Sequence, residues 1–159
     1  MTEFTRPELY MILNLPKPLW LCGVDLSGLD LRGVNLQGAI LMGANFSKCQ
    51  MRGADLIGAN LGGATLQDAN LVGADLRRTY LRGADLHGAD LREANLVEAD
   101  LFEANLSGTN LLDANLGGAD LTGANLTDAN LSGTNAPDYK ILRAKSLKGA
   151  IMPDGTIYE

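Results

Sequence analysis

Large apolar residues recur at every fifth position from Leu21 to Leu131. Of these 23 positions, 21 hold Leu, and the other two hold Phe46 and Met51. The residue two positions earlier is Ala in 16 of the 23 units, and the residue just before is Asn or Asp in 18. Gly stands two positions later in 15 units. The repeating unit is therefore Ala-(Asn/Asp)-Leu-x-Gly.

A period of five fits neither regular element. On an α-helix, five residues advance about 500°, so successive leucines would cover every face. On a straight strand, an odd period places alternate leucines on opposite sides. A chain that turns once per unit brings every Leu back to one interior, and Asn, Asp and Gly favour such turns. Backbone groups then pair with the coils above and below, so the pattern predicts a β-helix.

Units such as Ala84-Asp85-Leu86-His87-Gly88 resemble the A(D/N)LXX motif of pentapeptide-repeat proteins of the bacterial and cyanobacterial type. The resemblance covers residues 19–135. It implies an all-β fold, a right-handed quadrilateral β-helix with four pentapeptides per coil, in which the central Leu and the preceding small residue face inward. At four per coil, the 23 units make almost six coils. A spacing of about 4.8 Å per coil gives a rod about 28 Å long.

The ends of such a rod need caps, because end coils expose unpaired backbone and apolar core. Residues 1–18 are predicted to form an N-terminal helical cap. A capping box at Thr5-Arg6-Pro7-Glu8 starts a short helix over about residues 6–14, which we expect to lie over the first coil.

The C-terminal cap is expected over residues 136–159. The uninterrupted Leu ladder stops where Ala136 replaces the expected Leu, and the register then shifts by one residue. A short helical detour is predicted over residues 136–145. Degenerate repeats follow, and a turn at residues 153–156 ends them.

Composition narrows the classes of function. The net charge of −6 argues against a protein held on nucleic acid by phosphate contacts. No apolar run approaches the roughly 18 residues of a membrane-spanning helix, and the first residues lack the basic region of a secretion signal. Cys22 and Cys49 are distant in the sequence, form no CxxC motif and have a single His in the chain as a possible nitrogen partner, so neither a disulfide framework nor a zinc site is indicated. We expect free thiols, no cofactor, no membrane contact and a cytoplasmic location.

Outward positions also form a pattern when the repeat is stacked four units to a coil. One face then collects the large apolar groups: Trp20, Cys22, Ile40, Met42, Tyr80 and Phe102. We expect the N-terminal helix or the C-terminal tail to cover this face. The alternative is that the face is an interaction site, as exposed apolar area generally indicates.

Acidic residues concentrate in the second half of the chain. Eight lie between residues 93 and 138, where there is no Lys or Arg: Glu93, Glu98, Asp100, Glu103, Asp113, Asp120, Asp128 and Asp138. Some pentapeptide-repeat proteins protect DNA gyrase as acidic mimics of the duplex, so the resemblance makes that mode an alternative. We favour solvation and turn formation as the explanation, because Arg77, Arg78, Arg82 and Arg92 interrupt a long negative rod.

These observations predict a non-enzymatic protein-interaction or scaffold module that presents rigid faces. His87 has no nucleophile or carboxylate spaced around it, and a solid Leu core leaves no cavity for a substrate. The expected partner is a protein, or a second copy of the chain bound through an end or through the apolar face. The alternative is a topoisomerase inhibitor or protector that acts through the acidic half. The candidate contact residues are Trp20, Ile40, Met42, Tyr80, Phe102, Glu93, Glu98, Asp100 and Glu103.

Overall fold

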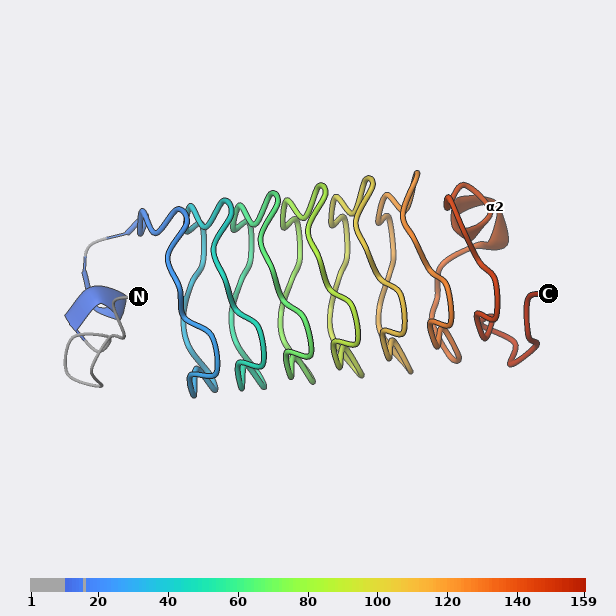
Figure 1. Ribbon diagram of the computed structural model, residues 1–159, viewed down its shortest axis with the longest axis horizontal. Coiled ribbons are helices and arrows are strands. Elements are labelled where there is room, and N and C mark those ends of the chain that lie inside the picture. Colours follow the sequence, from blue (N-terminus) through green and yellow to red (C-terminus); the bar gives the residue numbers. More distant parts are fainter. Residues whose placement is uncertain (1–10, 16) are drawn as a thin grey trace.

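The computed structural model describes residues 11–15 and 17–159 and shows a rod of stacked coils (Figure 1). Parallel β-bridges join equivalent residues of successive coils, as in Trp20↔Ile40 and Ile40↔Asn60, and continue to Asn110↔Asn130. The partners in each of these bridges are four pentapeptides apart, so each coil has four sides. The chain is a repeat β-solenoid, as the period of five predicts. The right-handed direction of winding stays a prediction.

Four ladders of large apolar side chains fill the interior. One of them consists of Leu26, Phe46, Leu66, Leu86, Leu106 and Leu126, and every member is at most 2% exposed. The Ala positions between the ladders are equally buried from Ala39 onward. Each fully buried Leu side chain contributes about 1.5–3 kcal/mol to folding. The inward register expected from the sequence is confirmed.

Each corner of the coil is a tight turn closed by a backbone hydrogen bond. In a representative turn, the Ala44 N–H donates to the Leu41 carbonyl at 3.0 Å, and Gly43 has a φ of 65°. Eight corners hold another residue at the same left-handed φ: Lys48, Asp68, Arg78, Glu93, Glu98, Glu103, Asp113 and Asp128. The backbone thus imposes a left-handed corner even where the sequence departs from Gly.

Asn and Asp side chains fix the position before each central Leu. In most units their Oδ1 accepts a hydrogen bond from the backbone N–H two positions later, as when the Ser47 N–H donates to Asn45 at 3.0 Å. The Asn amide groups also link neighbouring coils. The Asn105 Nδ2 donates to Asp85 Oδ1 at 2.9 Å, and the Asn135 Nδ2 donates to Asn115 Oδ1 at 2.8 Å. The preference for Asn and Asp therefore reflects both turn formation and coil stacking.

A helix and a hairpin complete the C-terminal end (Figure 1). Helix α2, Asp138–Ile141, buries Ile141, which stands at the central position one repeat after Ala136. The bridges then join Asn125 to Ser146 and Asn130 to Ile151, so each partner lies one position further along the chain than in the earlier coils. The predicted change of register is confirmed. The tail folds back through a turn at residues 153–156.

The tail pairs with the last partial coil. The Tyr158 N–H donates to the Ala150 carbonyl at 2.8 Å, and Ile157 forms an antiparallel bridge with Ile151. The last coil thus gains backbone partners that a bare end would lack.

At the N-terminal end, residues 11–13 are helical and lie beyond the first coil (Figure 1). Leu13 packs against the core cluster, together with Val24, Leu29 and Val34 of the first coil. The predicted capping box and the start of the predicted helix lie outside the described residues. Among the described residues, no helix has the length and apolar character to cross a membrane.

The inward register can be tested at one pair of neighbours. Leu86 is fully buried, whereas His87 is exposed. Leu86→Asp is expected to lower the free energy of unfolding by at least about 3 kcal/mol, because it leaves an unpaired carboxylate in the core and removes Leu packing. His87→Asp is expected to change it by less than about 1 kcal/mol. Thermal and urea unfolding measure both, and equal losses would contradict the assigned register.

The corners allow two substitutions with opposite expected signs. Glu93 has a φ of 59°, so Glu93→Gly relieves a conformation that costs a non-Gly residue about 1–3 kcal/mol. Greater freedom of Gly in the unfolded chain offsets about 0.4–1 kcal/mol of this gain, and a modest net stabilisation remains. Gly83→Ala should lose about 1–2 kcal/mol, because Gly83 has a φ of 61°. Urea unfolding of the two variants decides the matter, and a stabilised Gly83→Ala would be inconsistent with this turn.

Candidate protein-interaction surface

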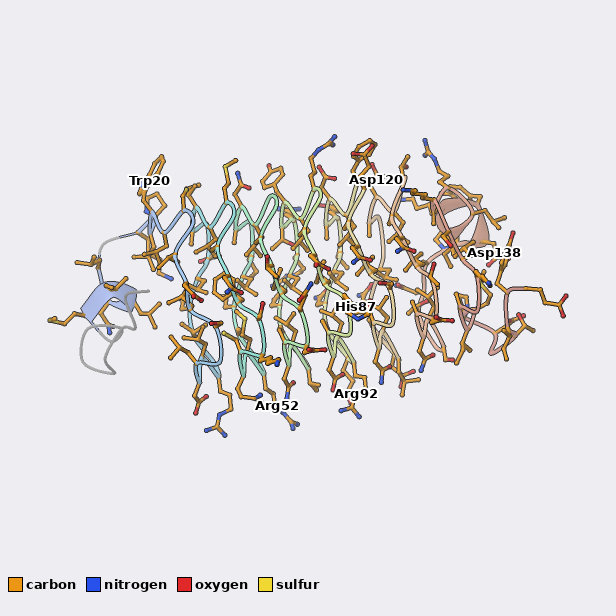
Figure 2. All side chains as sticks on the ribbon, viewed as in Figure 1. Trp20, Arg52, His87, Arg92, Asp120 and Asp138 are labelled. Carbon is orange, nitrogen blue, oxygen red and sulfur yellow. The ribbon has the colours of Figure 1, made fainter. Side chains whose placement is uncertain are left out.

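One side of the rod carries all the outward aromatic side chains of the repeat, together with Ile40 and Met42. The bridges place Trp20, Ile40, Asn60, Tyr80, Asp100 and Asp120 in one column, one residue per coil. On the same side, a second outward column lies two positions later in the sequence and holds Cys22, Met42, Gly62, Arg82, Phe102 and Thr122. We call this side the aromatic face. Figure 2 shows Trp20 and Asp120 on the same side of the rod, with Trp20 at its N-terminal end.

The apolar side chains of this face are open to solvent. Trp20 is 75% exposed, Tyr80 is 54% exposed and Met42 is 49% exposed. Ile40 and Phe102 are half-buried. Within the described residues nothing covers these side chains, so the expectation that the C-terminal tail covers this face is wrong, whereas much of the predicted N-terminal helix lies outside the described residues. Residues 11–13 lie beyond the first coil, and the tail pairs with the last one.

The fourth and fifth coils hold an ordered polar and aromatic cluster. The Arg82 guanidinium stacks over the Phe102 ring, with its carbon 4.2 Å from the ring centroid. The same guanidinium lies 3.4 Å from an Asp100 carboxylate oxygen. An exposed cation–π contact contributes about 0.5–1 kcal/mol. Arg82 is thus held in place by a ring and a carboxylate, and it adds a cation to the face.

The third coil is indented. Its outward positions hold Asn60 and Gly62, and Gly62 is not in the left-handed region. A Cβ built there would lie 3.3 Å from Asn60 Oδ1, with no other neighbour closer than 4.0 Å. Because Gly has no side chain, the face is lower here than at Met42 on one side and Arg82 on the other.

The acidic candidates separate into two groups. Asp100 lies on the aromatic face, and Glu98 and Glu103 occupy the two corners that border it in the same coil. Glu93 lies at a corner away from this face. The Arg78 Nε donates to Glu98 at 2.7 Å, so one of these carboxylates is paired. The structure therefore brings three of the four acidic candidates to the face and leaves Glu93 apart.

The carboxylates of residues 93–138 are distributed around the rod. The corner residues Glu93, Glu98, Glu103 and Asp128 belong to four different corners of the coil. The arginines expected to interrupt the negative rod are divided among three sides. The hydrogen bond from the Arg77 guanidinium lowers the pKa of the Asp75 carboxyl. Negative charge therefore forms a belt, with no single side made continuously acidic.

Sequence reasoning missed Arg82 and Gly62 as features of the face. Both could have been found from the same coil-to-coil register that collected the aromatic residues, because they occupy its second outward column. Arg82 is charged and Gly62 has no side chain, so neither belongs to a set chosen for large apolar residues. Asp120 was counted only as part of the acidic stretch. Hydrogen bonds from the Thr122 hydroxyl and N–H lower the pKa of its carboxyl.

His87 lies on a neighbouring, polar side (Figure 2). Its Nδ1 is 3.0 Å from both the carbonyl oxygen and the hydroxyl oxygen of Ser107. The expectation that no nucleophile lies near His87 is therefore wrong for Ser107. The Ser107 hydroxyl donates to Asn105 Oδ1 at 2.8 Å, and among the described residues no carboxylate is hydrogen-bonded to the imidazole. In the same part of the chain, no three His, Cys, Asp or Glu side chains are grouped so as to hold a metal ion.

The two cysteines are free and differ in environment. Cys22 is exposed on the aromatic face, whereas Cys49 is fully buried at an Ala position, with its Sγ 2.8 Å from the Leu26 carbonyl oxygen. Burial raises the pKa of the Cys49 thiol to about 11. The expectation of free thiols, with Cys49 made unreactive by burial, agrees with this structure.

A solenoid built from pentapeptides around four apolar ladders defines a class of β-repeat proteins. The family model for pentapeptide repeats (8 copies) matches residues 21–58, 59–96 and 99–135. The chain belongs to the pentapeptide repeat family. No curated protein matches it.

Several solved structures are similar to this chain. HetL, a protein involved in heterocyst differentiation regulation from Nostoc sp. strain PCC 7120, is 25% identical over 98% of this chain and 100% of its own, with a TM-score of 0.30. Rfr23 from Cyanothece 51142 is 30% identical over 79% of this chain and 89% of its own, with a TM-score of 0.34. QnrB1, a plasmid-mediated fluoroquinolone resistance protein, is 20% identical over 75% of this chain and 83% of its own, with a TM-score of 0.38.

The buried thiol gives a pH-dependent prediction. The pKa of Cys49 is about 11 in the folded protein against an ordinary value of 9.0, so the unfolded chain releases this proton at lower pH. The stability that this group provides is complete below pH 9 and is lost as the pH rises towards 11. Urea unfolding between these pH values should show a steeper decline for the wild type than for Cys49→Ala. Cys22→Ala is the matched control and should decline like the wild type.

Proposed function

We propose that the protein is a non-enzymatic interaction module whose aromatic face docks a protein partner. The observation that carries this proposal is the exposure of Trp20, Met42 and Tyr80 on one flat side of a rigid rod. Contiguous exposed apolar area on a folded protein is characteristic of interaction sites. Aromatic residues, Met and Arg are enriched at protein interfaces, and this face carries all of them.

The scaffold supports this role because it holds the contact residues in a fixed order. The Leu21 N–H donates to the Ile40 carbonyl at 2.8 Å, and the Leu61 N–H donates to the Tyr80 carbonyl at 2.8 Å. The backbone under each outward side chain is thus tied to the next coil. A preorganised surface loses little conformational entropy when it binds.

A contrast with a neighbouring side strengthens the proposal. The corresponding outward column there holds only polar residues: Asp25, Asn45, Thr65, Asp85, Asn105 and Asn125. These residues serve the turns and the stacking of the coils, and the general repeat therefore does not require large apolar groups at outward positions. At the position before the central Leu, apolar or aromatic residues occur on the aromatic face alone, as Trp20, Ile40 and Tyr80.

The acidic half supports the alternative, a DNA-mimicking topoisomerase inhibitor or protector, less well. A mimic of the duplex needs a long acidic surface along the rod, whereas the corner carboxylates from Glu93 to Asp128 are spread over all four corners of the coil. Arg78 and Arg82 also pair with Glu98 and Asp100. A DNA gyrase supercoiling assay with the purified protein tests this alternative directly.

The docking role predicts a specific loss of binding. Trp20→Asn and Tyr80→Asn place the preferred residue of the repeat at outward positions, so the fold should remain while the apolar contacts disappear. Immobilised wild type should capture a partner from bacterial lysate supplemented with a differently tagged copy of the chain. The double variant should retain less than about one tenth of that capture, because aromatic anchors dominate interface energies.

Leu112→Ser serves as the control, since it removes an outward apolar side chain from a different side of the rod. It should capture the partner as the wild type does. Circular dichroism and thermal unfolding establish that all variants are folded. Undiminished capture by the double variant would exclude the aromatic face as the docking site.

A further inference from the structure

The sizes of the outward residues would let the aromatic face pair with the same face of a second copy. Counted from Trp20, the third coil is the indented one, with Asn60 and Gly62, and the fourth coil projects, with Tyr80 and Arg82. Tyr80 is 54% exposed, and the Arg82 side chain is 56% exposed. The hollow and the projection are one coil apart, about 4.8 Å.

Consider a two-fold axis that lies in the plane of the interface, perpendicular to the rod, and passes between the third and fourth coils. It would place each projection opposite the hollow of a second copy. The two rods then run antiparallel, and the interface is isologous. The second coil then faces the fifth, and the first faces the sixth. Met42 lies opposite Phe102 of the second copy, and Trp20 lies opposite Asp120 of the second copy.

These pairs are chemically matched. Arg82 covers one face of the Phe102 ring, and a Met thioether forms favourable contacts at the edge of such a ring. The Trp20 indole N–H is a donor, and the Asp120 carboxylate is an acceptor. Arg82 is already paired with Asp100 within its own chain, so covering the face does not bury an unpaired charge.

Charge favours the antiparallel arrangement over a parallel one. Residues 93–138 hold eight acidic residues and no Lys or Arg, whereas residues 17–92 hold eight Lys and Arg against seven Asp and Glu. Antiparallel rods place the acidic half of each copy beside the nearly neutral half of the other. Parallel rods would superpose the two acidic halves, which is unfavourable.

The available area is sufficient for a stable dimer. The total accessible surface is 7825 Å², and the rod divides most of it among four sides. A quarter of that surface exceeds the about 800 Å² per partner that a standard interface buries.

We propose that the aromatic face binds a second copy of this chain in an antiparallel dimer with its two-fold axis between Gly62 and Arg82. The inference rests on the proposed function, because it names the occupant of the same face. Arg82 of one copy lies opposite Gly62 of the other, and Tyr80 lies opposite Asn60. The dimer covers Trp20, Met42 and Tyr80, the three exposed apolar residues of the face.

Two matched glycines provide the first test. Gly62 and Gly117 both follow a central Leu, neither is in the left-handed region, and a Cβ at Gly117 lies 3.1 Å from Asn115 Oδ1. The chain already holds Gln at this repeat position in Gln37 and Gln67, so Gln is compatible with the fold. Light scattering after size-exclusion chromatography should give wild type and Gly117→Gln twice the 16.8 kDa chain mass. Gly62→Gln, which fills the hollow, should weaken dimerisation at least tenfold.

Cross-linking tests the orientation without weakening the interface. In the antiparallel dimer, Cys22 lies opposite Thr122 of the second copy. Thr122→Cys treated with a short bismaleimide should therefore form a covalent dimer through Cys22 and the introduced thiol, identified by mass spectrometry. Within one chain these positions are five coils, about 24 Å, apart, too far for such a link. Cys49 is buried and should not react.

The outcomes separate this inference from the proposed function. A Cys22 to Cys22 link in the wild type, or a dimer lost on Ile157→Asp but kept in Gly62→Gln, would overturn the antiparallel dimer in favour of a parallel or end-to-end one. A monomeric wild type that still captures a different protein through Trp20 and Tyr80 would overturn the dimer and leave the proposed function standing. A monomer without any such capture would contradict both.

Discussion

The stacking of residues one full coil apart is the constraint on which the structure depends. Backbone N–H and carbonyl groups of each side pair with the coils before and after it, so a side chain's neighbours lie four pentapeptides away in the sequence. The same register brings the leucines together inside and sorts the outward residues into columns. Core and surface are therefore not independent, because one shift of register would rearrange both.

The left-handed corners show how firmly this register is maintained. Eight non-Gly residues adopt a backbone conformation that Gly adopts without cost, and five of them are carboxylates from residue 93 onward. Stacking must supply the free energy that holds them there. The consequence is a belt of negative charge on corners of the later coils, which biases how the rod meets another charged surface.

The aromatic face illustrates how a uniform scaffold becomes specific. Outward positions contribute little to folding, so Trp20, Tyr80 and Gly62 can vary without disturbing the interior. Because each is fixed to an ordered coil, small differences in side-chain size create relief on an otherwise flat side. Arg82, held by Phe102 and Asp100, adds a charge at a defined place.

Sequence alone determined the period, the inward Leu and Ala positions, the turn residues, the change of register near Ala136 and the column of apolar residues, because each follows from local spacing in a strict repeat. Only the tertiary structure decided that this column is exposed, that Ser107 lies beside His87 and that Arg82 stacks on Phe102. These features depend on where the ends of the chain pack and on how side chains from successive coils arrange themselves. Spacing along the chain specifies which residues are neighbours, but solvent access and side-chain geometry are set by what packs around them in three dimensions.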